Sequence, residues 1–278
     1  MKKRGDHVFL KRHSDSNVIE NVRYVNGIVS FGQVKLNVYC YEIDGVLIDT
    51  GSQSLLRHFK HFFQTMDVDQ VLITHDHEDH TGGASYIEQK LGLPIYIHQM
   101  SEDETRKKAS YPFYRKVFWG KRRPFQSKAL TNTFQSRQAN WDVIETPGHT
   151  ADHLSFLNKE TGQLFSGDIY VHPKTKVVLR QENMPELIRS LKHVLSYDFD
   201  TMFCSHAGYV KDGKKALQTK VDYLENMQGE ILYLHEEGKS LKEIEARIFK
   251  KKYPITLLSF GEWDTKHFIR SFIDNSST

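Results

Sequence analysis

The sequence is poor in cysteine and has no long apolar run. Its 278 residues include two cysteines, Cys40 and Cys204. This excludes a disulfide scaffold and a cysteine-rich zinc module, and it suits a reducing compartment. No stretch of about 18 apolar residues occurs, which excludes a membrane-spanning helix. The basic residues Lys2, Lys3 and Arg4 precede no apolar segment, so we expect no export signal and a cytoplasmic location.

The excess of one charge sign is also small. Lys and Arg number 38 against 35 Asp and Glu, a net charge of +3, which by itself says little about partners. The charged fraction of 26% and the hydrophobic fraction of 38% are ordinary for a globular protein. This length can bury a sizeable core and fits one large domain, alone or with an appendage. Histidine, with 15 copies, is frequent for a chain of this length.

The order of apolar patterns predicts a layered α/β sandwich. Asp44-Gly45 favours a tight hairpin turn between two apolar segments. Apolar residues then recur at helical spacing over 55–66, and a buried strand (71–73), a helix (82–91) and a strand (95–97) follow. Alternation of this kind is typical of layered α/β folds, whose loops gather at the strand ends. Further strands are predicted at 141–145, 153–157, 163–165 and 201–204, and helices at 185–196, along an apolar stripe from Leu217 to Leu234, and at 263–273.

Five histidines lie at predicted strand ends or in loops beside Asp and Gly, and two aspartates accompany them. The set comprises His75, His77, Asp79, His80, His149, Asp168 and His206. An extended backbone sends alternate side chains to the same side, so His75 and His77 can reach one ion. Asp79 and His80 can turn toward a second ion. Imidazole nitrogen and carboxylate oxygen suit zinc without a thiolate, and seven groups suffice for two ions that share one carboxylate.

At these residues the sequence resembles the metallo-β-lactamase superfamily of hydrolases. The motifs run in family order, and the last 65 or so residues contain none. They are Ile48-Asp49-Thr50-Gly51, His75-x-His77-x-Asp79-His80, Thr146-Pro147-Gly148-His149-Thr150, Ser166-Gly167-Asp168 and Ser205-His206-Ala207-Gly208. The resemblance implies a four-layered αββα sandwich. We therefore expect a metallo-β-lactamase-like domain over residues 1–212, with an insertion at 99–139, and a helical extension over 213–278 packed on it.

The resemblance also assigns roles to the clustered residues. The first metal would bind His75, His77 and His149, and the second would bind Asp79, His80 and His206, with Asp168 bridging the two. The implied cofactors are two Zn²⁺ ions, with iron or manganese as alternatives. A hydroxide bridging the ions would be the nucleophile, and Asp79 would be the catalytic group that orients it and later protonates the leaving group.

Two further residues receive weaker assignments. Asp49 is expected to hold a ligand histidine or Asp79 in place, with a simple turn residue as the alternative. Tyr170 follows Asp168 by two positions. Some lactonases of the family place a tyrosine near the metals to polarise the substrate carbonyl, so Tyr170 is a candidate substrate-binding residue, and ordinary packing is the alternative.

Within the superfamily, the leading interpretation is a hydrolase that cleaves a thioester or lactone of a small anionic substrate, similar to hydroxyacylglutathione hydrolases and acyl-homoserine lactonases. A phosphodiesterase or ribonuclease, an iron-dependent sulfur dioxygenase and a non-catalytic binding protein are the alternatives. We expect a small-molecule substrate rather than nucleic acid, and no membrane partner. A homodimer is left open.

The segment 99–139 stands out by its charge. It contains ten basic residues against three acidic ones, a net charge of +7, with seven interleaved aromatics. One hypothesis is a lid or wall that recognises an anionic substrate, in which Arg122 and Arg123 would take part. The other is a solvated surface excursion or a dimer contact.

Overall fold

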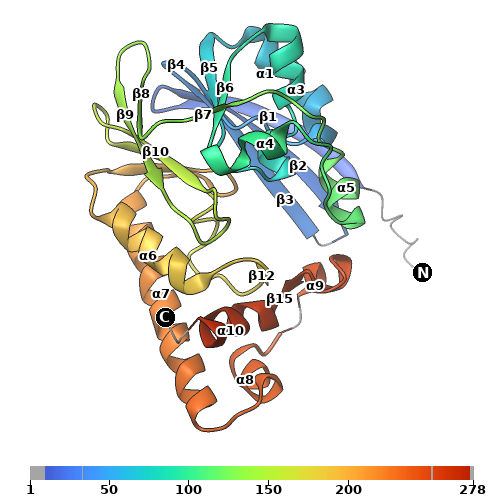
Figure 1. Cartoon of the computed structure of the whole chain (residues 1–278), viewed down its shortest axis with the longest axis vertical. Helices are drawn as coiled ribbons and strands as arrows, with labels where there is room; N and C mark the ends of the chain where they lie inside the picture. Colours follow the sequence, from blue (N-terminus) through green and yellow to red (C-terminus); the bar gives the residue numbers. More distant parts are fainter. Residues whose placement is uncertain (1–9, 33, 252, 276–278) are drawn as a thin grey trace, which may run out of the picture.

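The computed structural model describes residues 10–32, 34–251 and 253–275, and these form a sandwich of two sheets between helices (Figure 1). The first sheet runs in the order β1 (Lys11–Ile19), β2 (Val22–Phe31), β3 (Val34–Ile43), β4 (Gly45–Ile48), β5 (Val68–Leu72), β6 (Ile95–Ile97) and β7 (Lys128–Ala129). The second runs in the order β14 (Gly208–Val210), β13 (Thr201–Cys204), β11 (Gln163–Gly167), β10 (Leu154–Asn158), β9 (Asn140–Glu145) and β8 (Thr133–Gln135).

Three apolar clusters hold the layers together. Between the sheets, Tyr41 and Ile48 of the first pack with Trp141, Phe156 and Phe203 of the second. The outer face of the first sheet is covered by η1 (Gln53–Leu55), α1 (Leu56–Thr65), η2 (Ile87–Leu91) and α5 (Phe113–Trp119). The outer face of the second is covered by α6 (Met184–Leu195), α7 (Gly213–Glu236), α8 (Leu241–Ile248) and α10 (Thr265–Asp274). The order of layers is therefore αββα, as the resemblance implied.

Most predicted elements of the first 100 residues are confirmed. Asp44 and Gly45 both have positive φ, +47° and +78°, and Ile43 pairs with Val46 across the turn. The helix predicted over 82–91 is divided into α3 (Ala84–Tyr86) and the π-helical η2. It ends at Gly92, whose φ of +70° suits a residue without a side chain.

The segment 99–139 belongs to the sheets. After η3 (Gln99–Ser101), α4 (Glu102–Thr105) and α5 it supplies an edge strand to each sheet, because β7 pairs parallel with β6 and β8 pairs antiparallel with β9. The second half of the segment is therefore paired with both sheets, although most of its residues are exposed, as the interpretation as a solvated excursion expects. The two strands are 2 and 3 residues long, too short to leave an alternating pattern.

The C-terminal elements pack below the sandwich as drawn in Figure 1. The stripe from Leu217 to Leu234 is buried in α7, which contacts α6 and β13. The short helix α9 (Pro254–Leu258) begins at Pro254. β15 (Trp263–Asp264) then pairs with β12 (Val178–Leu179), and this pairing brings the C-terminal segment to the loop that precedes β12. The domain boundary at residue 212 stays a prediction.

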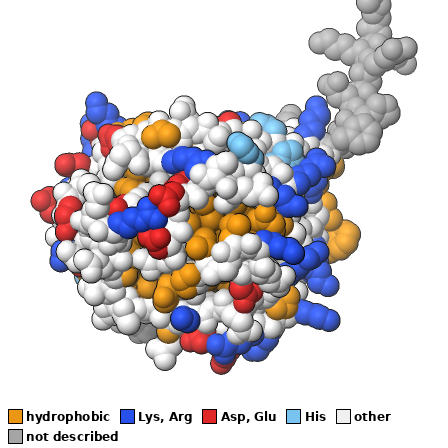
Figure 2. Space-filling view, turned by 90° about the horizontal axis from the view of Figure 1, so that it is seen from above, with side chains coloured by type: hydrophobic (Ala, Val, Ile, Leu, Met, Phe, Trp, Pro, Cys, Tyr) orange, Lys and Arg blue, Asp and Glu red, His pale blue; other side chains and the backbone are white. Residues whose placement is uncertain are grey.

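The surface of the described residues carries charged side chains of both signs, unevenly distributed. Figure 2 looks onto the end of the sandwich away from the C-terminal helices, where Lys and Arg gather mainly along one margin and hydrophobic side chains form a band beside them. Basic side chains are thus also present away from the C-terminal end. Residues 10–32, 34–251 and 253–275 include no helix with the length and apolar content needed to cross a bilayer.

Candidate metal centre

The chain delivers all the candidate ligands to one edge of the two sheets. His75 and His77 follow β5, and the short helix α2 (Glu78–Thr81) carries Asp79 and His80. Asp168 follows β11 and His206 follows β13. Strands β4, β5 and β6 are parallel, as are β11 and β13. The carboxyl ends of parallel strands meet at one edge, where the loops can converge.

The seven predicted ligands lie together. In each of three groups, the candidate ligand atoms all lie within 4.8 Å of one another: His75, His77 and His149; His75, His80 and Asp168; Asp79, His80 and His206. Asp168 is central, because its Oδ2 lies 3.0 Å from His206 Nε2, 3.5 Å from His80 Nε2 and 3.5 Å from His149 Nε2. This is the arrangement of two adjacent triads around one shared carboxylate.

The cluster fits metal ions better than it fits a hydrogen-bonded network. His80 Nε2 and Asp168 Oδ1 are buried and have no hydrogen-bond partner. His77 Nδ1 faces His75 Nε2 at 3.0 Å and His149 Nε2 at 3.2 Å. Buried polar atoms normally have hydrogen-bond partners, so a buried imidazole nitrogen without one, such as His80 Nε2, is available as a ligand for a cation, as are imidazole nitrogens that face one another. The residues present therefore fit a pair of divalent ions.

Burial favours the neutral form of two of the histidines. It lowers the pKa of His75 well below the usual range, and the nearby His80 and His77 lower it further. Burial and Arg115 do the same to the pKa of His77. Burial alone would raise the pKa of Asp168, but His206 and His80 outweigh it and hold that pKa well below its usual value. Neutral imidazole and ionised carboxylate are the forms that bind metals.

Asp49 lies beneath the cluster and is fully buried. Its Oδ2 accepts a hydrogen bond of 2.7 Å from His80 Nδ1, and its carboxylate also accepts from Thr74 N and from Ser205 Oγ. Asp49 was expected to hold either a ligand histidine or Asp79, and in the structure it holds the ligand candidate His80. The hydrogen bond places the His80 proton on Nδ1 and leaves Nε2 free to act as a ligand.

Other contacts to the cluster were missed by sequence reasoning. Glu182 Oε2 lies 3.1 Å from His149 Nδ1, and His206 Nδ1 donates to the carbonyl oxygen of Asn37. His153, to which the sequence assigned no role, is buried and accepts a hydrogen bond from the backbone N–H of Asp168. Glu182 lies in a loop without periodicity, so no sequence signal could have linked it to His149.

The structure places Tyr170 in the hydrophobic core that supports α6 and α7, with 8% of its surface exposed. It is not among the side chains that line the pocket beside the cluster. Its role in substrate binding stays a prediction. Cys204 is likewise buried, and its thiol faces the carbonyl oxygen of Gly167 at 3.4 Å.

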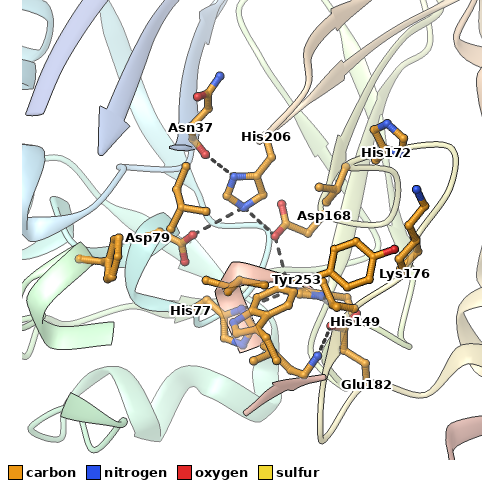
Figure 3. Close-up of a pocket in the computed structure, with 18 of the residues that line it drawn as sticks. Asn37, His77, Asp79, His149, Asp168, His172, Lys176, Glu182, His206 and Tyr253 are labelled. Atoms are coloured by element: carbon orange, nitrogen blue, oxygen red, sulfur yellow. Dashed lines mark hydrogen bonds and ion pairs between the residues drawn. The ribbon is translucent and has the colours of Figure 1, made fainter. Parts of the chain in front are cut away.

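A cavity of about 620 Å³ opens beside the cluster. His77, Asp79, His149, Asp168 and His206 line one part of it (Figure 3). The remaining lining is largely apolar. It comes from β3, α5, residues 171–179, α6 and the C-terminal segment. Its apolar side chains include Leu36, Tyr114, Phe118, Trp119, Val171, Leu179, Leu187, Tyr253, Ile255 and Trp263. Each predicted ligand in this lining is thus reachable by a substrate.

The basic residues of segment 99–139 mostly do not face this cavity. Arg122 is buried, and its guanidinium donates to the carbonyl oxygens of Glu104 and Thr105. Arg123 lines a separate depression near η1. The expectation that these two arginines recognise an anionic substrate at the metal edge is therefore wrong. Of the ten basic residues only Arg115 lines the cavity, and it is paired with the buried Glu78 at 2.6 Å.

Comparisons with known proteins agree with this geometry. The family model of the metallo-beta-lactamase superfamily matches residues 34–206. A beta-lactamase-like protein 2 homolog from Drosophila melanogaster is 24% identical over 236 residues, which is 81% of this chain and 76% of that protein. A hydroxyacylglutathione hydrolase from Marinomonas sp. is 34% identical over 122 residues, 44% of this chain and 40% of that protein. An atrochrysone carboxyl ACP thioesterase from Aspergillus fumigatus is 24% identical, over 59% of this chain and 46% of that protein.

Solved structures show the same fold. A metallo-beta-lactamase family protein from Thermus thermophilus superposes with a TM-score of 0.68 at 18% identity, over 93% of this chain and 95% of that one. A protein solved in a di-iron-bound form superposes with a TM-score of 0.54 at 25% identity, over 68% of this chain and 96% of that one. The matches to the two named enzymes cover less than half of their lengths.

Proposed function

Since the chain belongs to the metallo-β-lactamase superfamily of hydrolases, we propose that it is a dinuclear metallohydrolase that cleaves the thioester or lactone bond of a small anionic substrate. The observation that carries this proposal is the position of Asp168 Oδ2 between two triads of ligand atoms at the floor of an open cavity. Zinc is the proposed metal, with iron or manganese as alternatives, because the donors are imidazole and carboxylate without a thiolate.

Each group of residues has its own part in the proposed reaction. Two divalent ions bound here supply Lewis acidity and an activated water at neutral pH. Asp49 orients His80, and Glu182 orients His149, each by accepting a hydrogen bond from the Nδ1 of that histidine. Asp79 is 6% exposed, lines the cavity and approaches His206 Nε2 through Oδ2 at 3.6 Å. We therefore assign to Asp79 the transfer of a proton from the attacking water to the leaving group.

The test is a substrate panel with metal analysis. Purified protein should contain about two zinc ions per chain and should hydrolyse thioesters or lactones faster than bis-nitrophenyl phosphate. His77→Ala should lower kcat/KM by about 100-fold or more, because it removes a donor that faces His75 and His149. His193→Ala, on the exposed side of α6, is the matched control and should retain full activity.

Each alternative outcome has its own meaning. Unchanged activity of His77→Ala would show that the reaction takes place elsewhere. Faster cleavage of the phosphate diester than of any thioester or lactone would replace the proposed bond. One iron per chain together with oxygen consumption would replace hydrolysis with a dioxygenase reaction.

A further inference from the structure

The cavity beside the metal cluster combines an apolar interior with a cationic rim. We propose that it binds a thioester whose acyl group is bulky and apolar and whose thiol half carries phosphate groups. This inference rests on the proposed hydrolase function and specifies its substrate class. In the reaction, the oxygen of water bonds to the acyl carbon, the carbon–sulfur bond breaks, and the products are a carboxylate, a thiol and one released proton.

The interior of the cavity is larger and more apolar than a short acyl group needs. A volume of about 620 Å³ lies within the range of pockets that enclose drug-sized ligands, about 300–1,000 Å³. Five of the lining side chains present mostly carbon surface: Phe118, Trp119, Tyr253, Ile255 and Trp263. An acetyl group would leave most of this surface wetted, whereas a long-chain or aromatic acyl group would cover it.

The cationic residues sit where the cavity meets solvent. Lys35, Lys174 and Lys176 all line it and are all exposed, and Figure 3 shows Lys176 and His172 on the side away from Asp79. Among the described residues, none forms an ion pair with these three lysines, whereas Arg106, Lys107 and Arg137 of segment 99–139 are all paired with carboxylates. Exposed ammonium groups at a pocket mouth suit phosphate, which each can approach as a point charge.

The wall formed by the C-terminal segment is fixed to the metal edge. Arg115 of α5 donates to both oxygens of Glu78 at 2.6 Å and lies 3.6 Å from Glu262. Glu78 belongs to α2, the helix that carries Asp79, and Glu262 precedes Trp263. The interior is therefore held in place before the substrate arrives. Tyr253, Ile255 and Trp263 lie outside the range 34–206 that the family model matches, so membership of the family does not by itself imply this selectivity.

The experiment uses two matched series of thioesters. The first contains coenzyme A esters of acetyl, butanoyl, octanoyl, dodecanoyl and benzoyl groups, and the second contains the same acyl groups on N-acetylcysteamine, which carries no phosphate. Up to the length the cavity accepts, each added methylene should raise kcat/KM by as much as about fourfold in both series. Coenzyme A esters should have the lower KM at every length.

Variants separate the interior from the rim. Ile255→Ala and Trp263→Ala should lower kcat/KM for the octanoyl and dodecanoyl esters more than for the acetyl ester, which flattens the dependence on chain length. Lys174→Ala/Lys176→Ala should raise KM for coenzyme A esters by about fivefold or more, with a clearly smaller effect on N-acetylcysteamine esters. Lys211→Ala/Lys215→Ala, two exposed lysines that do not line the cavity, is the control. The melting temperature of each variant confirms that it is folded.

The outcomes also separate this inference from the proposed function. Equal kcat/KM for acetyl and octanoyl esters would overturn the apolar acyl site, although the hydrolase would stand. An equal effect of the lysine pair on both series would overturn the phosphate rim. If the metal-loaded wild type cleaved no thioester at all, the thioester branch of the proposed function would fail first.

Discussion

Glu182 shows how one side chain from a loop can support a candidate metal ligand, His149. Its Oε2 lies 3.1 Å from His149 Nδ1 while Oε1 accepts from the backbone N–H of Leu179 at 2.8 Å. The backbone of Leu179 thus holds one oxygen of the Glu182 carboxylate, and the other oxygen orients the imidazole of His149. A carboxylate in this position also increases the electron density on the opposite ring nitrogen, which strengthens a metal bond there.

We predict that Glu182→Gln weakens metal binding by about 10–100-fold while kcat at saturating metal changes much less. A chelator competition titration measures the affinity directly. Glu186→Gln, on the same stretch but without a place in the cavity lining, is the control and should bind metal as the wild type does. Equal metal affinity of the two variants would mean that Glu182 only packs against the ring.

The sequence was enough to predict the candidate ligands, but not the groups that hydrogen-bond to them and orient them. The ligands stand close in sequence or beside glycine in recognisable motifs, as with His75, His77 and His80. Glu182 and the carbonyl oxygen of Asn37 reach the cluster through loop conformation and strand placement. Such contacts depend on the completed fold, so local sequence carries no signal for them.

At the scale of elements, α2 depends on a close contact between two backbones. A Cβ atom at Gly82 would lie 2.1 Å from Gln53 N and 2.6 Å from Ser52 Cα. The φ of Gly82 is −64°, an ordinary helical value, so the requirement for glycine is one of space alone. The helix that carries Asp79 and His80 is positioned by this contact and by the hydrogen bond from Gly82 N to Gly51 O.

We predict that Gly82→Ala destabilises the protein by about 1–3 kcal/mol and lowers its metal content, because α2 must move away from residues 51–53. Gly229→Ala is the matched substitution, since a Cβ there meets nothing within 4 Å on the exposed side of α7. It should stabilise the protein by about 0.5–1 kcal/mol. Urea unfolding of both variants measures the difference, and a Gly82→Ala protein as stable as the wild type would contradict the argument.

Element prediction succeeded where an element is long enough to show a period. The helices predicted at 55–66, 185–196 and 263–273 correspond to α1, α6 and α10 within two residues at either end. By contrast, β7 and β8 are only 2 and 3 residues long, and β7 pairs with β6, a strand that is distant in sequence. Segment 99–139 therefore looked irregular although it closes the edge of both sheets.

At the scale of the whole molecule, part of the positive charge of segment 99–139 is paired with carboxylates. Arg137 pairs with Asp67 and Asp69 beside β5, and Arg106 pairs with Glu102 and Asp103. Composition could count these charges but could not locate their partners. The charges that do reach the cavity mouth belong to other parts of the chain, which is why the net charge of a segment was a poor guide to what it binds.

Arg115 joins three distant parts of the molecule, since it lies on α5, pairs with Glu78 on α2 and approaches Glu262 of the C-terminal segment. It is about one-tenth exposed and Glu78 is about 2% exposed. The attraction therefore acts in a medium that screens it weakly, and removing one partner leaves a buried charge without compensation.

We predict that Arg115→Gln destabilises the protein by about 3–5 kcal/mol. Glu78→Gln/Arg115→Gln should recover part of this loss, because the uncompensated charge is gone. Urea unfolding measures the free energy of unfolding of each variant in this double-mutant cycle. Arg106→Gln is the control, because Arg106 is a more exposed arginine paired with Glu102. Its loss should cost about 1 kcal/mol or less. If the double variant were no more stable than Arg115→Gln, the pair would not act as a unit, and the C-terminal wall would be held over the metal edge by its apolar contacts instead.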